Sequence, residues 1–193
     1  VKMHQDPMGT SNKDPVASCG EIRLIYEHAR LLNSETLDIV NKMYADDWRP
    51  DYLVGITRGG NIPATIISNM TGIRCEALKV SLRDDNRESE SACWMAEDAF
   101  GYPHQDSGGH GKNILIVEDI FDTGLTLSYL KKILDSRNPK SLEFMCMFIK
   151  DTDKTTSLDI KYHGFKIGPE FVVGYGLDFE GKYRELPYLA VLS

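Results

Sequence analysis

The sequence feature that most constrains the fold is the alternation of short apolar runs with helix-forming patterns. Residues 52–56, 114–117 and 144–149 are too short and too uniformly apolar for amphipathic helices, and they predict strands that are buried on both faces. Helical patterns follow the first two runs, over residues 62–70 and 125–134. This alternation predicts an α/β fold with a single domain, in which a mainly parallel twisted sheet has helices on both faces. Ligands of such sheets bind beyond the carboxyl ends of the strands.

The N-terminal part of the chain precedes this alternating pattern. Residues 1–18 are polar and without periodicity, and they are predicted to be a disordered tail or a remnant of cloning. The domain itself is expected over residues 19–193. Apolar residues at three- and four-residue steps predict a first helix over residues 22–32, and a second helix is predicted from Ser34 to about residue 47.

One segment interrupts the alternation in the middle of the chain. Residues 82–112 are rich in charge, glycine and histidine, with aromatic residues between them. Irregular segments of this length in compact domains are usually functional or disordered. Two interpretations stay open, because the segment could cover a ligand as a lid or form a surface patch or subunit contact.

Composition narrows the classes of partner and location. The 193 residues include 29 acidic and 22 basic side chains, a formal charge of −7, which disfavours binding to nucleic acid. No apolar run approaches the roughly 18 residues of a membrane span, and the first residues lack the apolar stretch of a secretory signal. The four cysteines lie far apart and are expected to be reduced thiols. We therefore expect a cytoplasmic protein without membrane or nucleic-acid partners.

The most informative segment is ILIVEDIFDTGLTL, in which a predicted buried strand leads into the start of a helix. Backbone N–H groups at a helix N-terminus form a site for a phosphate dianion, and hydroxyl side chains can add to it. A glycine there lets the chain approach the ligand closely. The residues expected to form this phosphate turn are Asp122, Thr123, Gly124, Leu125 and Thr126.

Two adjacent acids, Glu118 and Asp119, directly follow the predicted strand. They could accept hydrogen bonds from vicinal sugar hydroxyls or bind Mg²⁺ through its hydration shell. The alternative is that they only cap the following helix, as acids near helix starts often do. Capping accounts for one of them at most, so the pattern favours a ligand site.

Three runs of the sequence resemble segments of one enzyme family. The run VEDIFDTGLT, residues 117–126, resembles the ribose-phosphate signature of the type I phosphoribosyltransferases, which use 5-phosphoribosyl 1-pyrophosphate with Mg²⁺. The run TRGG, residues 57–60, resembles the pyrophosphate loop of that family, in which a non-proline cis peptide bond would fall between Thr57 and Arg58. Residues 171–192 are similar to the C-terminal part of the hypoxanthine-guanine enzymes, which implies a small hood formed by this part of the chain.

The resemblance implies a role for each matching position. The expected donor-binding residues are Thr57, Arg58, Gly59, Gly60, Ser81, Glu118, Asp119, Asp122, Thr123, Gly124, Leu125, Thr126 and Arg184. The expected base-binding residues are Lys150, Phe171, Val172 and Asp178. The expected cofactor is Mg²⁺, with Glu118, Asp119 and Asp178 as its carboxylates.

The activity implied is transfer of the 5-phosphoribosyl group to N9 of a 6-oxopurine, with release of pyrophosphate. Asp122 matches the general base of the family and would handle the proton at purine N7. The substrates expected are hypoxanthine, guanine or xanthine, because Lys150 can donate but not accept and so favours a carbonyl at position 6 over the amino group of adenine. Related enzymes are dimers or tetramers, so a homodimer or homotetramer is expected.

Two positions depart from the family pattern. Ser81 is followed by Leu82, whereas the lid of the purine enzymes usually starts with Ser-Tyr. Arg58 resembles the xanthine-guanine branch, while the C-terminal part resembles the hypoxanthine-guanine branch, so base preference is only partly fixed. Two other functions stay open: a regulator that binds the ribosyl donor without catalysis, and a phosphoribosyltransferase for another base such as adenine or orotate.

Overall fold

A computed structural model describes residues 22–26, 28–81, 92–94, 109–151 and 156–192. Within these ranges no helix is long and apolar enough to cross a membrane. The elements in chain order are β1 (Ile22–Tyr26), α1 (His28–Ala45), β2 (Tyr52–Ile56), α2 (Asn61–Thr71), β3 (Arg74–Ser81), β4 (Ala92–Trp94), β5 (Asn113–Phe121), α3 (Leu125–Asp135), β6 (Ser141–Lys150), β7 (Tyr162–Ile167), β8 (Phe171–Val173) and β9 (Leu189–Leu192).

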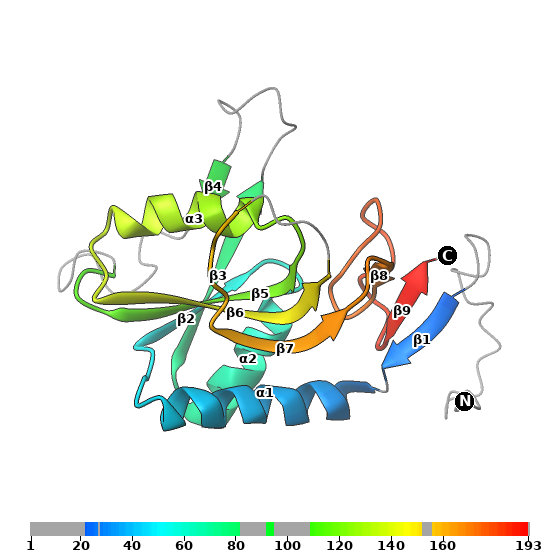
Figure 1. The fold of residues 1–193 in the computed structure, drawn as a ribbon, viewed down its shortest axis with the longest axis horizontal. Coiled ribbons are helices and arrows are strands. Elements are labelled where there is room, and N and C mark those ends of the chain that lie inside the picture. Colours follow the sequence, from blue (N-terminus) through cyan, green and yellow to red (C-terminus); the bar gives the residue numbers. More distant parts are fainter. Residues whose placement is uncertain (1–21, 27, 82–91, 95–108, 152–155, 193) are drawn as a thin grey trace.

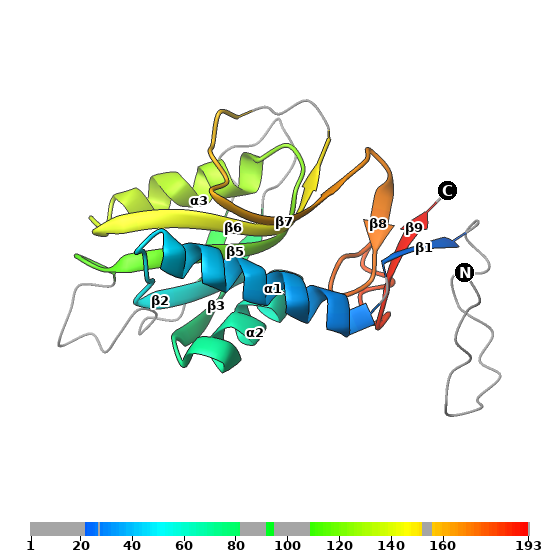
Figure 2. The ribbon, with the colours of Figure 1, turned by 60° about the horizontal axis from the view of Figure 1, so that its bottom comes forward.

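The larger of two sheets confirms the predicted α/β architecture. Its strand order is β4-β3-β2-β5-β6-β7, and every pair is parallel except β3 with β4. Helices α1 and α2 cover one face and α3 covers the other (Figure 1). Figure 2 shows α1 and α2 side by side on their face. The predicted strands and helices at residues 52–56, 62–70, 114–117, 125–134 and 144–149 are all present.

Burial on both faces explains the uniformly apolar composition of the central strand β5. Leu115 and Val117 belong to the core cluster beneath α1 and α2, whereas Ile114 and Ile116 pack with Leu130 of α3. All four strand residues are fully buried. Since successive side chains of a strand point to opposite faces, a strand covered by helices on both sides needs apolar residues at every position.

The order of the strands fixes where a ligand can bind. From β2 the chain proceeds to β3 on one side, while β5, β6 and β7 follow one another on the other side. The connections therefore diverge between β2 and β5, and such a switch point leaves a crevice at the carboxyl ends of the two strands. The loops that leave these two ends are the ones that resemble the donor-binding segments.

The prediction for the N-terminal part is wrong in two respects. Residues 22–26 form strand β1 and not a helix, and a single helix α1 replaces the two predicted ones. β1 pairs antiparallel with β9, with Ile22 opposite Leu192 and Leu24 opposite Ala190. The run IRLIY fits helical and alternating patterns equally, and the backbone partner offered by β9 decides between them.

The second sheet has three strands in the order β1-β9-β8, and all pairs are antiparallel. It lies beyond the carboxyl ends of β6 and β7, next to the predicted site (Figure 1). Its own small core is formed by Val173, Tyr183, Leu186 and Ala190. This sheet contains β1 in addition to β8 and β9 from the C-terminal part, and a small hood formed by the C-terminal part stays a prediction.

Candidate functional site

The loop between β2 and α2 contributes the first wall of the site. The peptide bond between Thr57 and Arg58 is cis, as the resemblance predicted, and Arg58 is exposed while Gly59 and Gly60 are buried. A Cβ atom on Gly59 would overlap the carboxylate of Asp119, and one on Gly60 would overlap the carbonyl oxygen of Val117. The two glycines therefore let the loop pack directly against β5.

The adjacent acids lie inside β5 and not after it, because the strand extends four residues beyond its predicted end. Pairing with β2 ends at Val117, while pairing with β6 continues to Phe121. The Asp119 N–H donates to Glu118 Oε1 at 3.2 Å, and the Ile120 N–H donates to Asp119 Oδ1 at 2.8 Å. Both acids therefore lie in the part of β5 that extends beyond its pairing with β2.

Burial controls the protonation of this acidic pair. Loss of solvent raises the pKa of Glu118 well above its usual value, and the neighbouring charge of Asp119 raises it further. Burial also raises the pKa of Asp119, against hydrogen bonds and the nearby positive charge of Arg184, which lower it. A cation placed between these groups would favour their ionised forms, so the donor set suits a hard divalent ion.

The turn after β5 contributes a cavity of about 270 Å³ lined by residues 118–127. Gly124 precedes α3 in the left-handed conformation, with φ of 85°. A Cβ atom there would overlap the methyl group of Thr156 and contact the ring of Phe121. The backbone amides at the N-terminus of α3 and the hydroxyls of Thr123 and Thr126 line a site with the chemistry of an anion receptor.

A second cavity of about 190 Å³ adjoins the turn and lies between the large and small sheets. Lys150, at the end of β6, is only 7% exposed, and its Nζ lies 3.1 Å from Asp122 Oδ2. The same Nζ lies 5.3 Å from the ring centroid of Phe171, the first residue of β8. The residues that line this cavity are Asp119, Ile120, Asp122, Lys150, Phe171, Val172, Leu177 and Asp178.

A charged pair in the C-terminal segment faces the acids of β5. Arg184 Nη2 lies 2.6 Å from Asp178 Oδ1, and Arg184 Nη1 also donates to the carbonyl oxygen of Gly176. The other carboxylate oxygen of Asp178 accepts the N–H of Gly181 at 2.7 Å. Asp178 shares the second cavity with Asp119, so carboxylates from β5 and from the C-terminal segment line one space.

Comparison with known proteins identifies the family of this site. The model of the phosphoribosyl transferase domain matches residues 26–180, which include both β5 and the phosphate turn. The chain belongs to the phosphoribosyl transferase domain family. The resemblance inferred from residues 57–60 and 117–126 is therefore confirmed at the level of the family.

Named relatives of this phosphoribosyl transferase domain share a purine substrate. A hypoxanthine phosphoribosyltransferase of Escherichia coli (strain K12) is 45% identical over 153 residues, which are 78% of this chain and 82% of that protein. A hypoxanthine-guanine phosphoribosyltransferase of Mycobacterium tuberculosis (strain H37Rv) is 48% identical over 84 residues, 44% of this chain, and the match spans only 42% of that relative. A crystal structure of a hypoxanthine-guanine phosphoribosyltransferase from Bacillus anthracis aligns with a TM-score of 0.75 and 25% identity, covering 90% of this chain and 100% of that chain.

Most of the residues predicted for donor and base binding in this phosphoribosyl transferase domain line the two cavities or their edges. Ser81 ends β3, but its side chain lies outside the described residues, as does most of the predicted lid segment 82–112. Leu125, at the start of α3, exposes its side chain, and its N–H donates to Thr123 Oγ1 at 3.5 Å. Ile120 and Leu177 line the second cavity without having been predicted, because apolar side chains carry no chemical signal in a sequence.

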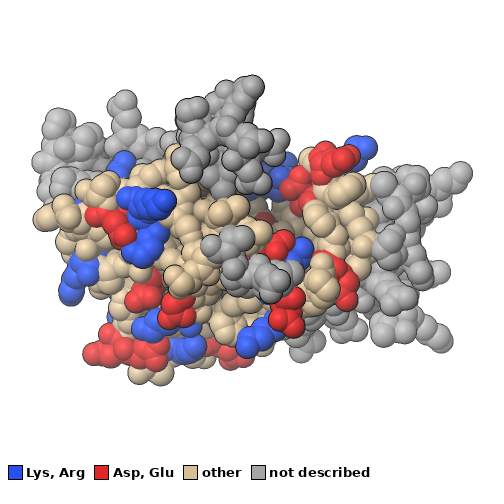
Figure 3. Space-filling view, turned by 45° about the horizontal axis from the view of Figure 1, so that its top comes forward, with Lys and Arg blue, Asp and Glu red and all other residues tan. Residues whose placement is uncertain are grey.

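Two features of the described residues bear on metal ions and on surface charge. Among the described residues, no three His, Cys, Asp or Glu side chains come together as a metal site would require. Acidic and basic side chains are interspersed on the face shown in Figure 3.

Proposed function

We propose that this phosphoribosyl transferase domain transfers the 5-phosphoribosyl group from 5-phosphoribosyl 1-pyrophosphate to N9 of a 6-oxopurine in purine salvage. The observation that supports it most is the position of Lys150. Its ammonium lies between Asp122 of the phosphate turn and the ring of Phe171. A purine bound at Phe171 would thus lie next to a ribosyl donor bound at the turn.

The donor is proposed to bind along the carboxyl ends of β2 and β5. Its 5′-phosphate would occupy the 270 Å³ cavity, where backbone amides at the start of α3 and two threonine hydroxyls can donate to it. Its ribose hydroxyls would face Glu118 and Asp119. Its pyrophosphate would lie at the loop of residues 57–60, within reach of the guanidinium of Arg184.

The carboxylates near this donor position fit Mg²⁺. Glu118, Asp119 and Asp178 offer hard oxygen ligands, and magnesium is commonly bound by one or two carboxylates together with substrate phosphates. When bound, Mg²⁺ would neutralise the negative charge of the leaving pyrophosphate. The fixed guanidinium of Arg184, already paired with Asp178, would add positive charge on the same side.

The second cavity suits a planar base with a carbonyl group. The ring of Phe171 is 44% exposed and offers an apolar face for stacking. Lys150 can donate to a 6-oxo group but cannot accept from a 6-amino group. The backbone of Val172 and the carboxylate of Asp178 would contact the remaining edge of the base. With adenine bound, the nearly buried ammonium of Lys150 would face the 6-amino group, which is also a donor, and this disfavours the binding of adenine.

The chemical step exchanges one bond at the anomeric carbon for another. The bond from C1′ to the pyrophosphate oxygen breaks, the bond from C1′ to purine N9 forms, and the purine loses one proton. An oxocarbenium-like sugar forms between these events, and nearby carboxylates can stabilise its positive charge. Asp122 is proposed to accept the proton at N7, with its carboxylate positioned by the ion pair with Lys150.

A pyrophosphate-release assay with hypoxanthine, guanine, xanthine and adenine in parallel tests this proposal. We expect release with one or more 6-oxopurines in the presence of Mg²⁺ and little release with adenine. Donor binding without release for any base would instead indicate a non-catalytic donor-binding protein. A preference for adenine or orotate would indicate that the enzyme is a phosphoribosyltransferase for a base other than a 6-oxopurine. We propose further that the protein acts as a homodimer or homotetramer in the cytoplasm.

A further inference from the structure

We propose that Phe179 is a positioning residue that sets the place of the purine-stacking ring of Phe171. This inference rests on the proposed function, because it assumes that Phe171 stacks on the base. It adds a specific side chain, outside the lining of the cavity, on which base affinity depends.

Phe171 has little support from the main core. It is the first residue of β8, and its large apolar side chain is exposed. Its backbone pairs with Leu192 at the open end of the small sheet. On the side of the cavity its ring faces the ammonium of Lys150 at 5.3 Å. A ring this exposed can change rotamer easily unless another group limits it, and loss of rotamer freedom on binding weakens affinity.

Contact with Phe179 limits the rotamers of Phe171. Its ring centroid lies 5.3 Å from that of Phe171, and the ring planes are at 80°, an edge-to-face arrangement. Such aromatic pairs prefer this geometry and are stabilised beyond the area they bury. The contact leaves the face of Phe171 near Lys150 available for the base, because Phe179 does not line that cavity.

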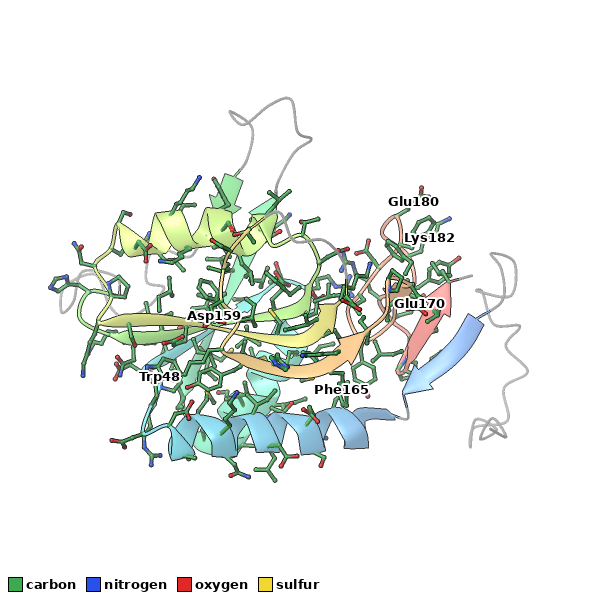
Figure 4. The ribbon with its side chains drawn as sticks, viewed as in Figure 1. Trp48, Asp159, Phe165, Glu170, Glu180 and Lys182 are labelled. Carbon is green, nitrogen blue, oxygen red and sulfur yellow. The ribbon has the colours of Figure 1, made fainter. Side chains whose placement is uncertain are left out.

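Phe179 is itself anchored by backbone and side-chain contacts. Its N–H donates to the Lys182 carbonyl oxygen at 3.1 Å, and the Lys182 N–H donates back to the carbonyl of Phe179 at 3.0 Å. Its side chain packs against the small core that includes Leu186. Figure 4 labels Glu170, which precedes Phe171 in the chain, and Glu180 and Lys182, which follow Phe179, and shows all three at the end of the molecule with the small sheet. The small core thereby determines where the stacking ring lies.

The test compares Phe179→Leu with two controls in steady-state kinetics. Phe179→Tyr keeps the ring edge, and Phe165→Leu removes a ring from a different aromatic pair, with Phe148, outside the second cavity and the small core. We expect Phe179→Leu to raise the KM for hypoxanthine by about 2- to 12-fold, the range of an aromatic pair. The KM for the ribosyl donor should stay within about twofold of wild type in all three variants, and both controls should leave the KM for hypoxanthine within about twofold.

The outcomes separate this inference from the proposed function. An unchanged KM for hypoxanthine in Phe179→Leu, or an equal rise in Phe165→Leu, would overturn the role of Phe179 while leaving transferase activity intact. If Phe179→Leu does not fold, Phe179→Met keeps a large apolar side chain without a ring and carries the same expectation. If wild type releases no pyrophosphate with any base and calorimetry detects no binding of inosine 5′-monophosphate, the proposed function and this inference both fail.

Discussion

Replacement of Asp122 by asparagine separates catalysis from stability at the centre of the site. The change removes the carboxylate that is proposed to accept the purine proton, while it keeps the size of the side chain and one oxygen that can accept from Lys150. General acid–base catalysis contributes about 10²- to 10⁴-fold to rate. We therefore expect kcat to fall by about that factor, which corresponds to roughly 3–5 kcal/mol in the barrier.

The cost to stability is smaller. The side chain of Asp122 is 45% exposed, so water screens its attraction to Lys150 Nζ at 3.1 Å. Exposed ion pairs contribute up to about 1 kcal/mol, and the retained oxygen of asparagine preserves part of the hydrogen bond. For a domain of this size 1 kcal/mol lowers Tm by roughly 2–4 °C. The loss of turnover should therefore far exceed what unfolding can explain.

Asp135→Asn is the matched control for this experiment. Asp135 is similarly exposed and pairs with Lys131 across one turn of α3, outside both cavities. Pyrophosphate release and thermal denaturation should be measured on wild type and both variants, with the donor dissociation constant from calorimetry. A kcat of Asp122→Asn within about twofold of wild type would refute the assignment of the general base, since acid–base catalysis is worth at least about 10²-fold. A similar fall of kcat in Asp135→Asn would refute the claim that the effect depends on the position of Asp122 in the site.

Three further predictions concern the base, pH and the core. Lys150→Gln should lower kcat/KM for hypoxanthine by about 10- to 100-fold, as expected for the loss of a hydrogen bond from a charged donor. The same variant should show a smaller preference for hypoxanthine over adenine, which competition between the two bases measures. Burial raises the pKa of Glu118, so the native state retains a proton that the unfolded state loses, and stability falls as pH rises above the ordinary carboxyl pKa. Glu118→Gln should therefore gain more stability at pH 8 than at pH 4 in denaturant titrations, and an equal gain at both would contradict this. Met43→Ala, at a fully buried position of α1, should cost about 2–5 kcal/mol in the same titrations, whereas a cost under 1 kcal/mol would argue against the packing described.

The parts of the fold that could be predicted are those in which local pattern and burial agree. The strands at residues 52–56 and 144–149 are covered by helices on both faces, so their sequences are uniformly apolar. β3 was not predicted as a strand, because RCEALKVS places charged residues within the run. The run IRLIY was assigned to a helix, because pairing with β9, far away in the sequence, could not be read from local spacing.

The same distinction applies to the site. The phosphate turn could be predicted because its chemistry lies in consecutive residues after one strand. The effect of Arg184 on the pKa of Asp119 could not, because it depends on how the C-terminal segment returns to β5. Phe179 gave no signal of its own, because an aromatic residue near the C-terminus is equally consistent with core packing. Its relation to Phe171 becomes visible only from the geometry of the two rings.

The central claim is that the turn after β5 binds the phosphate of a ribosyl donor. Calorimetric titration of 5-phosphoribosyl 1-pyrophosphate with Mg²⁺ into wild type and Gly124→Val tests it most directly, because a side chain at Gly124 would collide with Phe121 and Thr156. We expect saturable binding to one site per chain of wild type and at least roughly tenfold weaker binding to the variant. Absence of binding to wild type, or equal affinity of the two proteins, would contradict it.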